Sequence, residues 1–552
     1  MIKFSNLERD KRVHQLKETN FDLIVIGGGI TGAGILLDAA SRGMKVALVE
    51  KNDFASGTSS KSTKLIHGGL RYLKQFDFWL VKEVGSERAI VHKLAPHLVI
   101  PEKMLLPLIE NGSYGKWLTS IGLKVYDILA QVEGEDQRKM LEKKPALELE
   151  PLLPEEILKG AGYYAEYRTD DARLTLENIK TALDFDGVPI NYTKVTDFEY
   201  ENGQVSGVQV KDEITGEAYK VHAKYVINAA GPWVDNLRET DGSKKGKRLH
   251  LTKGVHLVFP HEKLPVKQSV YFDIPDGRMM FAIPRGKITY VGTTDTNFYD
   301  DKDDVQVDLA DAIYLISAVN NMFPDINLEM EDIISTWAGL RPLIHEEGKS
   351  ASELSRKDET FVSKSGLISI AGGKLTGYRK MAERVVNRVA KEYEDDFDKE
   401  FKKNFTDEIP LKGGPFENHK DVEHYIEEVF KRIQGNGFVS YDAWYLVTNY
   451  GKQTEKILEK YASFKDEDIY VRMIKAELHF GVEHEMIQTP MDFFIRRTGR
   501  LYFDIDSMRS LMDPVLEEFK KIFGLDQAVV ENYRNILLNT IDRHSDFSFD
   551  RV

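Results

Sequence analysis

The pattern of apolar and polar residues is clearest near the start of the chain. Residues 21–26 are a short apolar run rich in β-branched side chains, and the glycine-rich residues 27–34 follow at once. Residues 35–43 have the apolar spacing of a helix that ends at a glycine, and residues 45–50 are a second apolar run. The pattern predicts a strand, a tight turn, a helix and a second, buried strand.

The turn in this unit carries glycine at the spacing that a dinucleotide site needs. Gly27 permits the tight turn, and Gly29, which follows Gly28, lets the backbone approach a pyrophosphate. Gly32 allows the helix to pack closely on the strand, and free N–H groups at the helix start hold phosphate. Glu50 ends the second strand, where a carboxylate binds ribose hydroxyls. A dinucleotide site is therefore predicted here; the alternative is a glycine-rich turn without a ligand.

Two later segments bear on which dinucleotide binds. Residues 57–63 are a hydroxyl-rich loop, in which Ser59 and Ser60 are candidates for further phosphate contacts. Residues 225–231 are another apolar strand, which ends in Ala230 and Gly231. A distant strand that returns to the same sheet suits a long, deeply embedded cofactor such as FAD, although on its own this segment is equally compatible with an ordinary core strand.

The composition of the chain excludes several classes of ligand and of redox chemistry. The 552 residues include 75 Lys and Arg against 89 Asp and Glu, and the net charge of −14 disfavours nucleic-acid binding. Cysteine is absent, which excludes disulfides, iron–sulfur clusters, thiolate zinc sites and cysteine nucleophiles. Redox chemistry therefore falls to an organic cofactor or to a metal with other ligands. The N-terminus lacks the apolar core of a signal peptide, so we expect a cytoplasmic chain.

Two segments carry a resemblance to a known family. Residues 26–43 resemble the first signature of FAD-dependent glycerol-3-phosphate dehydrogenases, with Leu36 in place of the usual alanine, and residues 372–382 look like the second signature. Further similar segments follow in the family order, at residues 62–72, 252–256, 291–296, 338–343 and 489–498. The same family includes the alpha-glycerophosphate oxidases.

The resemblance implies FAD as the cofactor and oxidation of sn-glycerol 3-phosphate to dihydroxyacetone phosphate by hydride transfer from C2. It implies that electrons pass to menaquinone or ubiquinone, and that the chain is peripheral on the inner face of the cell membrane. Three rivals stay open: an alpha-glycerophosphate oxidase that makes H2O2 from O2, an amine or amino-acid oxidase on the same fold, and a non-catalytic flavin-binding protein. The oligomeric state is also open, with a homodimer among the options.

The expected architecture has three parts. The resemblance implies an α/β FAD-binding Rossmann-like domain of the glutathione-reductase or D-amino-acid-oxidase type, an inserted α+β substrate-binding domain and a C-terminal all-α domain. We expect the FAD-binding domain at residues 20–80, 170–250 and 345–395. The substrate-binding domain is expected at residues 81–169 and 251–344, and the C-terminal domain at residues 405–552. The charge-dense residues 391–414 are typical of a linker. Within the inserted domain, residues 277–285 and 287–292 are expected to be strands joined at Gly286.

We expect arginine to bind the phosphate of the substrate, because a planar guanidinium matches phosphate oxygens. In the family, the residues that match Arg341, Arg356 and Lys374 line the substrate pocket, and Arg285 is a further candidate. The alternative for each is a solvated surface charge.

Histidine suits the base that removes the C2 hydroxyl proton, because it titrates near neutral pH. The candidates are His67 and His256, and Arg71 and Tyr72 are placed to orient His67. The alternative for either histidine is a structural hydrogen bond.

The second signature is expected to begin a helix whose positive N-terminal end faces the flavin. The candidates for cofactor contacts there are Gly373, Lys374, Leu375 and Thr376. Asp295 is expected to position the flavin, with the capping of a turn as the alternative.

Two further segments suggest a metal site and a membrane-surface helix, and for both we favour a structural interpretation. Residues 477–485 contain His479 and His484 without the HExxH spacing, so we expect no metal site. Residues 114–129 are amphipathic, and a core-facing helix is favoured there over a helix that lies on a membrane surface.

Overall fold

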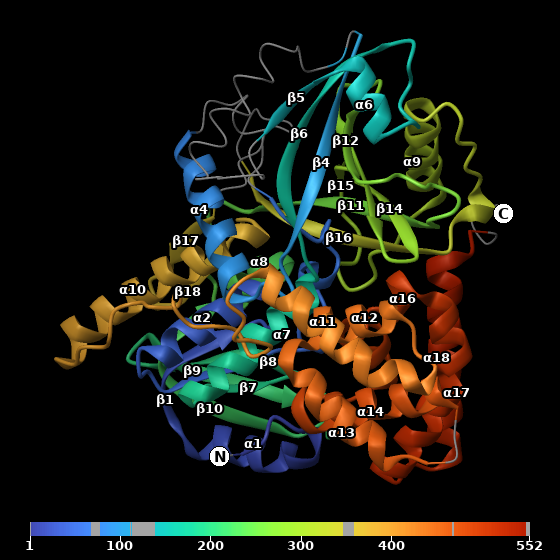
Figure 1. Ribbon diagram of the computed structural model, residues 1–552. Helices are drawn as coiled ribbons and strands as arrows, with labels where there is room; N and C mark the ends of the chain where they lie inside the picture. The colour runs from blue at the N-terminus through green and yellow to red at the C-terminus, as the bar shows by residue number, and fades with distance from the viewer. Residues whose placement is uncertain are drawn as a thin grey trace.

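The computed structural model describes residues 2–67, 78–110, 112, 138–345, 358–465 and 468–547. Within these ranges the chain forms two mixed β-sheets and a helical region near the C-terminus (Figure 1). The first sheet lies at the lower left of the view and the second at the top. The helices between residues 419 and 545, here called the C-terminal region, are drawn in orange to red beside both sheets.

The first sheet is built around the two strands predicted near the N-terminus. β1 (Asn20–Ile26) pairs in parallel with β2 (Val46–Val49) and with β10 (Ala218–Asn228). β2 is buried along its whole length, as parallel strands with helices on both faces usually are. Distant parts of the chain complete the sheet: β7 (Val188–Ile190), β8 (Thr193–Glu201), β9 (Gln204–Asp212), β17 (Glu359–Val362) and β18 (Ile368–Ala371).

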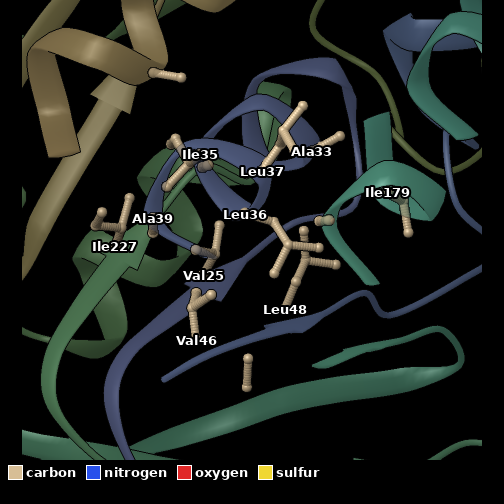
Figure 2. Close-up of a cluster of buried hydrophobic side chains, with 14 of the residues drawn as sticks. Val25, Ala33, Ile35, Leu36, Leu37, Ala39, Val46, Leu48, Ile179 and Ile227 are labelled. Atoms are coloured by element: carbon tan, nitrogen blue, oxygen red, sulfur yellow. The ribbon is translucent and has the colours of Figure 1, made fainter. Parts of the chain in front are cut away.

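Helix α2 (Ile30–Ser41) lies on this sheet and packs against α7 (Asp171–Ala182) and α10 (Tyr378–Phe397). It begins inside the glycine motif, earlier than the apolar spacing alone predicts. Figure 2 shows its apolar side chains meeting those of β1 and β2. Leu36, the departure from the family signature, is fully buried in this cluster, so the sheet accommodates the larger side chain.

The second sheet stands against the carboxyl ends of the first. Its strands run in the order β15 (Thr296–Asn297), β11 (Leu249–Pro260), β14 (Ile288–Gly292), β13 (Met279–Arg285), β12 (Ser269–Asp273), β4 (Ile100–Ile109), β6 (Leu158–Arg168) and β3 (Leu65–Ile66). β16 (Ser335–Ile344) pairs with β11, and β5 (Lys139–Glu142) pairs with β6. The predicted hairpin is confirmed, because β13 and β14 are antiparallel and Gly286 between them has a φ of 61°.

Helices cover the second sheet on both faces. α9 (Leu309–Met322) and α6 (Lys143–Leu149) contribute to the apolar cluster on one face, and the C-terminal region contributes to the cluster on the other. The C-terminal helices are α11 (His419–Ile433), α12 (Ser440–Tyr450), α13 (Thr454–Ser463), α14 (Ile469–His484), α15 (Pro490–Asp492), α16 (Arg500–Phe503), α17 (Ile505–Phe523) and α18 (Gln527–Ser545).

The packing of α4 (Phe78–Leu94) differs from the expected division of the chain. Val91 and Leu94 belong to the buried cluster of the first sheet, whereas residues 81–169 are expected in the substrate-binding domain. The apolar end of α4 therefore supports the first sheet. The other domain boundaries stay predictions, and the amphipathic residues 114–129 lie outside the described residues. In the described part of the chain, no helix has the length and apolar character that crossing a membrane requires.

Candidate cofactor and substrate cavity

A cavity of about 1090 Å³ opens where the strand ends of the first sheet meet the second sheet. At one end it is lined by the loops after β1, β2 and β10, and at the other by residues of β11, β13 and β16. Its walls therefore come from segments that are far apart in the sequence. Its size is above the usual range for a drug-sized ligand and suits a dinucleotide together with a small substrate.

The glycine turn shapes the wall next to β1. Gly27 has a φ of 114°, a conformation that L-residues rarely adopt, and a Cβ there would lie 2.5 Å from the carbonyl oxygen of Ala229. A Cβ on Gly32 would collide with the carbonyl oxygen of Gly27. Gly27 and Gly29 line the cavity, while Gly28 and Gly32 lie behind them and fix the shape of the turn. This geometry suits a phosphate group, and the binding of phosphate by these glycines stays a prediction.

Glu50 is held beside this turn by the backbone. Its Oε2 accepts the N–H of Gly28 at 2.7 Å, and its Oε1 accepts the N–H of Asn52 at 2.9 Å. Burial raises the pKa of Glu50, and these two bonds oppose that effect. The side chain lines the cavity where β2 ends, which is the position expected for a ribose contact.

The hydroxyl-rich loop of residues 57–63 forms the next part of the wall. Ser59 Oγ accepts the N–H of Ile30 at 2.9 Å, which caps the first turn of α2. Ser59 lines the cavity, but Ser60 does not. Ser60 is 1% exposed and its carbonyl oxygen accepts a hydrogen bond from the ammonium group of Lys64, so its contact with the cofactor stays a prediction that its burial does not support. Across the cavity, Ala230 and Gly231 line the wall after β10, as expected.

The second signature also lines the cavity, through Gly373, Lys374, Leu375 and Thr376. The helix begins later than expected, at Tyr378, after a single 3₁₀ turn at Leu375–Gly377. Gly372 and Gly373 cannot belong to it, because their φ values are 79° and 85°. The start of this helical segment nevertheless faces the cavity, which places its N–H groups where they favour negative charge.

Arg341 lies on β16 and reaches the cavity from the second sheet. Its Nη1 donates to the carbonyl oxygen of Thr294 at 2.9 Å and to Asp295 Oδ1 at 3.2 Å, and its Nη2 donates to Thr293 Oγ1 at 2.8 Å. The side chain is 21% exposed. Gly254 on the neighbouring strand leaves the space that the guanidinium fills, because a Cβ there would collide with it. Asp295 thus orients Arg341, and its predicted contact with the flavin stays a prediction.

Arg285 does not line the cavity, so its predicted role in binding substrate is not supported. It donates to the carbonyl oxygen of Thr169 at 3.0 Å and pairs with Asp170 at 3.4 Å. Its guanidinium also lies 3.9 Å from the ring centre of Phe503 in the C-terminal region. Arg285 therefore joins three parts of the fold. The other three predicted residues, Arg71, Tyr72 and Arg356, lie outside the described residues.

The two candidate histidines have different surroundings. His67 is half-buried on the cavity wall, with its ring 6.2 Å from that of Phe281. His256 is 1% exposed and stacks on Trp337 at 4.9 Å, with Nε2 3.0 Å from Thr63 Oγ1. Burial, with Arg341 and Lys64 nearby, lowers the pKa of His256 well below its usual value. His256 is therefore neutral at physiological pH.

Sequence reasoning missed the groups that hold the hydroxyl-rich loop in place. Trp337 Nε1 donates to the carbonyl oxygen of Ser62 at 3.0 Å, and the Tyr290 hydroxyl donates to that of Thr63 at 3.1 Å. Lys64 forms a buried ion pair with Asp171 at 2.6 Å. No local pattern could reveal these partners, because they lie more than a hundred residues from the loop. These contacts hold the loop in its place on the cavity wall.

The wall residues fit a flavin dinucleotide. The glycine turn suits a pyrophosphate, and the carboxylate of Glu50 suits a ribose. The hydroxyl-rich loop and the start of the helix place polar groups along the rest of the cavity. FAD would be held by these residues, and the cations and histidines of the second sheet would face a substrate bound beside it.

Comparisons with known proteins agree with this assignment. The family model for FAD dependent oxidoreductases matches residues 22–379, and that for the C-terminal domain of alpha-glycerophosphate oxidase matches residues 404–530. Aerobic glycerol-3-phosphate dehydrogenase of Bacillus subtilis (strain 168) is 50% identical over 546 residues, which is 98% of each chain. The protein of the same name from Staphylococcus aureus (strain USA300) is 48% identical over 534 residues, 96% of each chain.

A solved structure extends the comparison to three dimensions. The X-ray structure of glycerol-3-phosphate dehydrogenase from Bacillus halodurans complexed with FAD matches with a TM-score of 0.84 and 43% identity, and covers 99% of both chains. The expected fold and the expected FAD cofactor are thereby confirmed. The chain belongs to the FAD-dependent oxidoreductases and, among them, to the family of aerobic glycerol-3-phosphate dehydrogenases.

Proposed function

We propose that this chain oxidises sn-glycerol 3-phosphate to dihydroxyacetone phosphate. The observation that carries the proposal is the 50% identity, over 98% of the chain, to a protein named for this activity. The cavity offers the matching chemistry, because Arg341 of the second sheet and Lys374 of the second signature both line it. When bound, FAD supplies the hydride acceptor that no side chain can provide.

The phosphate of the substrate would be bound by the cations of the second sheet and of the second signature. Arg341 is suited to this because its hydrogen bonds to Thr293 and Thr294 and its ion pair with Asp295 hold the guanidinium in one orientation. Lys374 adds a second positive charge on the cavity wall. Arg356, which lies outside the described residues, is the third candidate by its resemblance to the family pocket.

We assign the base to His67. The C2 hydroxyl proton must leave as hydride is transferred, and the imidazole of a histidine on the cavity wall can accept it. His256 is the weaker candidate, because its lowered pKa makes it a poor proton acceptor and its Nε2 already faces Thr63. His256 would instead hold the hydroxyl-rich loop in position, and Arg71 and Tyr72 stay candidates for orienting His67.

The proposed electron acceptor is a membrane quinone, either menaquinone or ubiquinone, which would require docking on the inner face of the cell membrane. The names of the relatives favour a dehydrogenase. An alpha-glycerophosphate oxidase that uses O2 is the second candidate, because the family model that matches residues 404–530 carries that name. Assembly as a homodimer stays a prediction.

The visible spectrum of the flavin tests the proposal. Under nitrogen, sn-glycerol 3-phosphate should bleach the bound flavin, and glycerol without phosphate should not. Fast recovery of the colour with a short-chain menaquinone analogue, but slow recovery in air, would identify a dehydrogenase. Fast recovery in air with stoichiometric peroxide would identify an oxidase, and a flavin that is not bleached would refute the proposed substrate.

A further inference from the structure

Two consecutive arginines of the C-terminal region reach one carboxylate beside the cofactor cavity. Arg496 Nε lies 2.5 Å from Asp53 Oδ2, and Arg497 Nη1 and Nη2 donate to Oδ2 and Oδ1 of Asp53 at 2.7 and 2.8 Å. The amide of Asn191 donates to Asp53 Oδ1 at 3.1 Å. Both oxygens of Asp53 are thus fully engaged, mainly by residues from the other end of the chain.

The two arginines lie in one turn of π-helix, Phe493–Arg497. Such wide turns are rare and frequently occur at functional sites. Arg496 is anchored a second time, by Asp492 at 2.7 Å, and Asp492 also accepts the hydroxyl of Tyr192 at 2.7 Å. The arginine pair is therefore fixed on its own side before it meets Asp53.

Asp53 is joined to the cofactor cradle by a very short stretch of backbone. It lies three residues after Glu50, and the N–H of Ala55 donates to the carbonyl oxygen of Gly28 at 3.0 Å. Ala55 has a φ of 60°, which is uncommon for a residue other than glycine and persists only where the surroundings enforce it. The ring of Phe54 fills the space beside Gly28, where a Cβ would lie 2.8 Å from it. The position of Asp53 thus constrains the segment that carries Glu50 and packs on the glycine turn.

Opposite charges hold this cluster together in a buried site. Asp53 is 1% exposed and Arg497 is 1% exposed. Burial acts to raise the pKa of Asp53, but Arg497 and Arg496 outweigh it and lower that pKa to about 2. Removing one partner of such a buried group leaves a charge without compensation, which is costly and disturbs the segment that carries it.

We propose that Arg496 and Arg497 are cofactor-positioning residues, through which the C-terminal region holds residues 50–55 in the conformation that binds FAD. The helical region would then support cofactor binding through Asp53, in addition to covering the second sheet. The arginines act through Asp53 and do not touch the cavity, since neither lines it.

The test compares the release of FAD from the holoenzyme in two matched variants. Arg497→Gln removes the fork on Asp53. Arg500→Gln is the control, because Arg500 pairs with Glu477 at 2.7 Å wholly inside the C-terminal region. The rate of FAD release and its dissociation constant are read from the rise in flavin fluorescence on dilution. Arg497→Gln should weaken FAD binding by at least about tenfold, while Arg500→Gln keeps the wild-type value.

A second pair of variants separates positioning from general loss of structure. Asp53→Asn should weaken FAD binding as Arg497→Gln does. The effect of the double variant should be clearly less than the sum of the single effects, because the two residues share the Asp53–Arg497 contact. Far-UV circular dichroism reports whether each variant is folded. Unchanged FAD affinity in folded Arg497→Gln, equal loss in Arg500→Gln, or fully additive effects would overturn the proposal.

Discussion

His256 and Thr63 meet through a single contact, with the imidazole Nε2 3.0 Å from the hydroxyl oxygen. His256 is buried and neutral, and its ring is stacked on Trp337. This arrangement suits a structural role for His256, which holds the hydroxyl-rich loop, better than it suits a role in proton transfer. The structure therefore separates two histidines that look equivalent in the sequence.

The pH dependence of kcat/KM distinguishes the roles of His67 and His256. If His67 is the base, its protonation should lower kcat/KM for sn-glycerol 3-phosphate at acid pH. His67→Asn should lower the rate by about 100-fold or more and remove this acid limb. His256→Gln should reduce the rate less and keep the limb, because the base is still present. An acid limb that survives in His67→Asn and disappears in His256→Gln would reverse the assignment.

Arg341→Ala should raise KM for sn-glycerol 3-phosphate by about 10- to 100-fold, since a charge-assisted contact to phosphate is lost. The flavin should stay bound, which its absorbance spectrum shows. Arg285→Ala is the matched control, because this arginine lies on the same sheet but outside the cavity. It should lower the temperature of unfolding and leave KM near the wild-type value. A large rise in KM for Arg285→Ala alone would place the phosphate elsewhere.

Gly32→Ala should produce a protein that is purified with little FAD. The added methyl group would collide with the carbonyl oxygen of Gly27, so the helix or the turn must move, at a cost of about 3 kcal/mol. Gly435→Ala serves as the control, because a Cβ there meets nothing within 4 Å. The flavin content per polypeptide of the two variants, measured by absorbance, tests this prediction. A normal content in Gly32→Ala would show that the turn can adjust.

His97 should make the protein less stable in mild acid. The ring is 0% exposed, neither of its nitrogens has a hydrogen-bond partner in the described residues, and burial lowers its pKa to about 4. Glu177 opposes this shift, while Arg173 and Lys180 add to it. Between pH 6.5 and 4 the unfolded chain binds a proton that the folded chain excludes, so stability falls as the pH falls.

The slope attributable to His97 is about 1.4 kcal/mol per pH unit within this window. His97→Gln should make the loss of unfolding free energy between pH 6.5 and 5 correspondingly smaller. Urea unfolding of wild type and variant at several pH values measures the difference. Parallel curves for the two proteins would mean that His97 takes up its proton without unfolding.

Local chemistry explains which features the sequence predicts well. The glycine turn, the strand before it and Glu50 lie close together in the chain, and each glycine is needed for a reason visible within that unit. Arg285 shows the opposite case, because its partner Asp170 is 115 residues away and only the fold brings them together. Asp53 and Arg497 are 444 residues apart, so no local pattern could connect them.

The order of strands in the first sheet has a consequence for synthesis on the ribosome. β18 pairs with β10, and its last residue is Ala371, so a nascent chain that stops earlier leaves an edge of β10 without its neighbour. Arg497, which meets the loop after β2, emerges later still. Long-range pairings of this kind form slowly, and incomplete chains expose strand edges that favour aggregation. The first sheet and the loop after β2 therefore gain all their partners only when synthesis has passed Arg497, near the end of the chain.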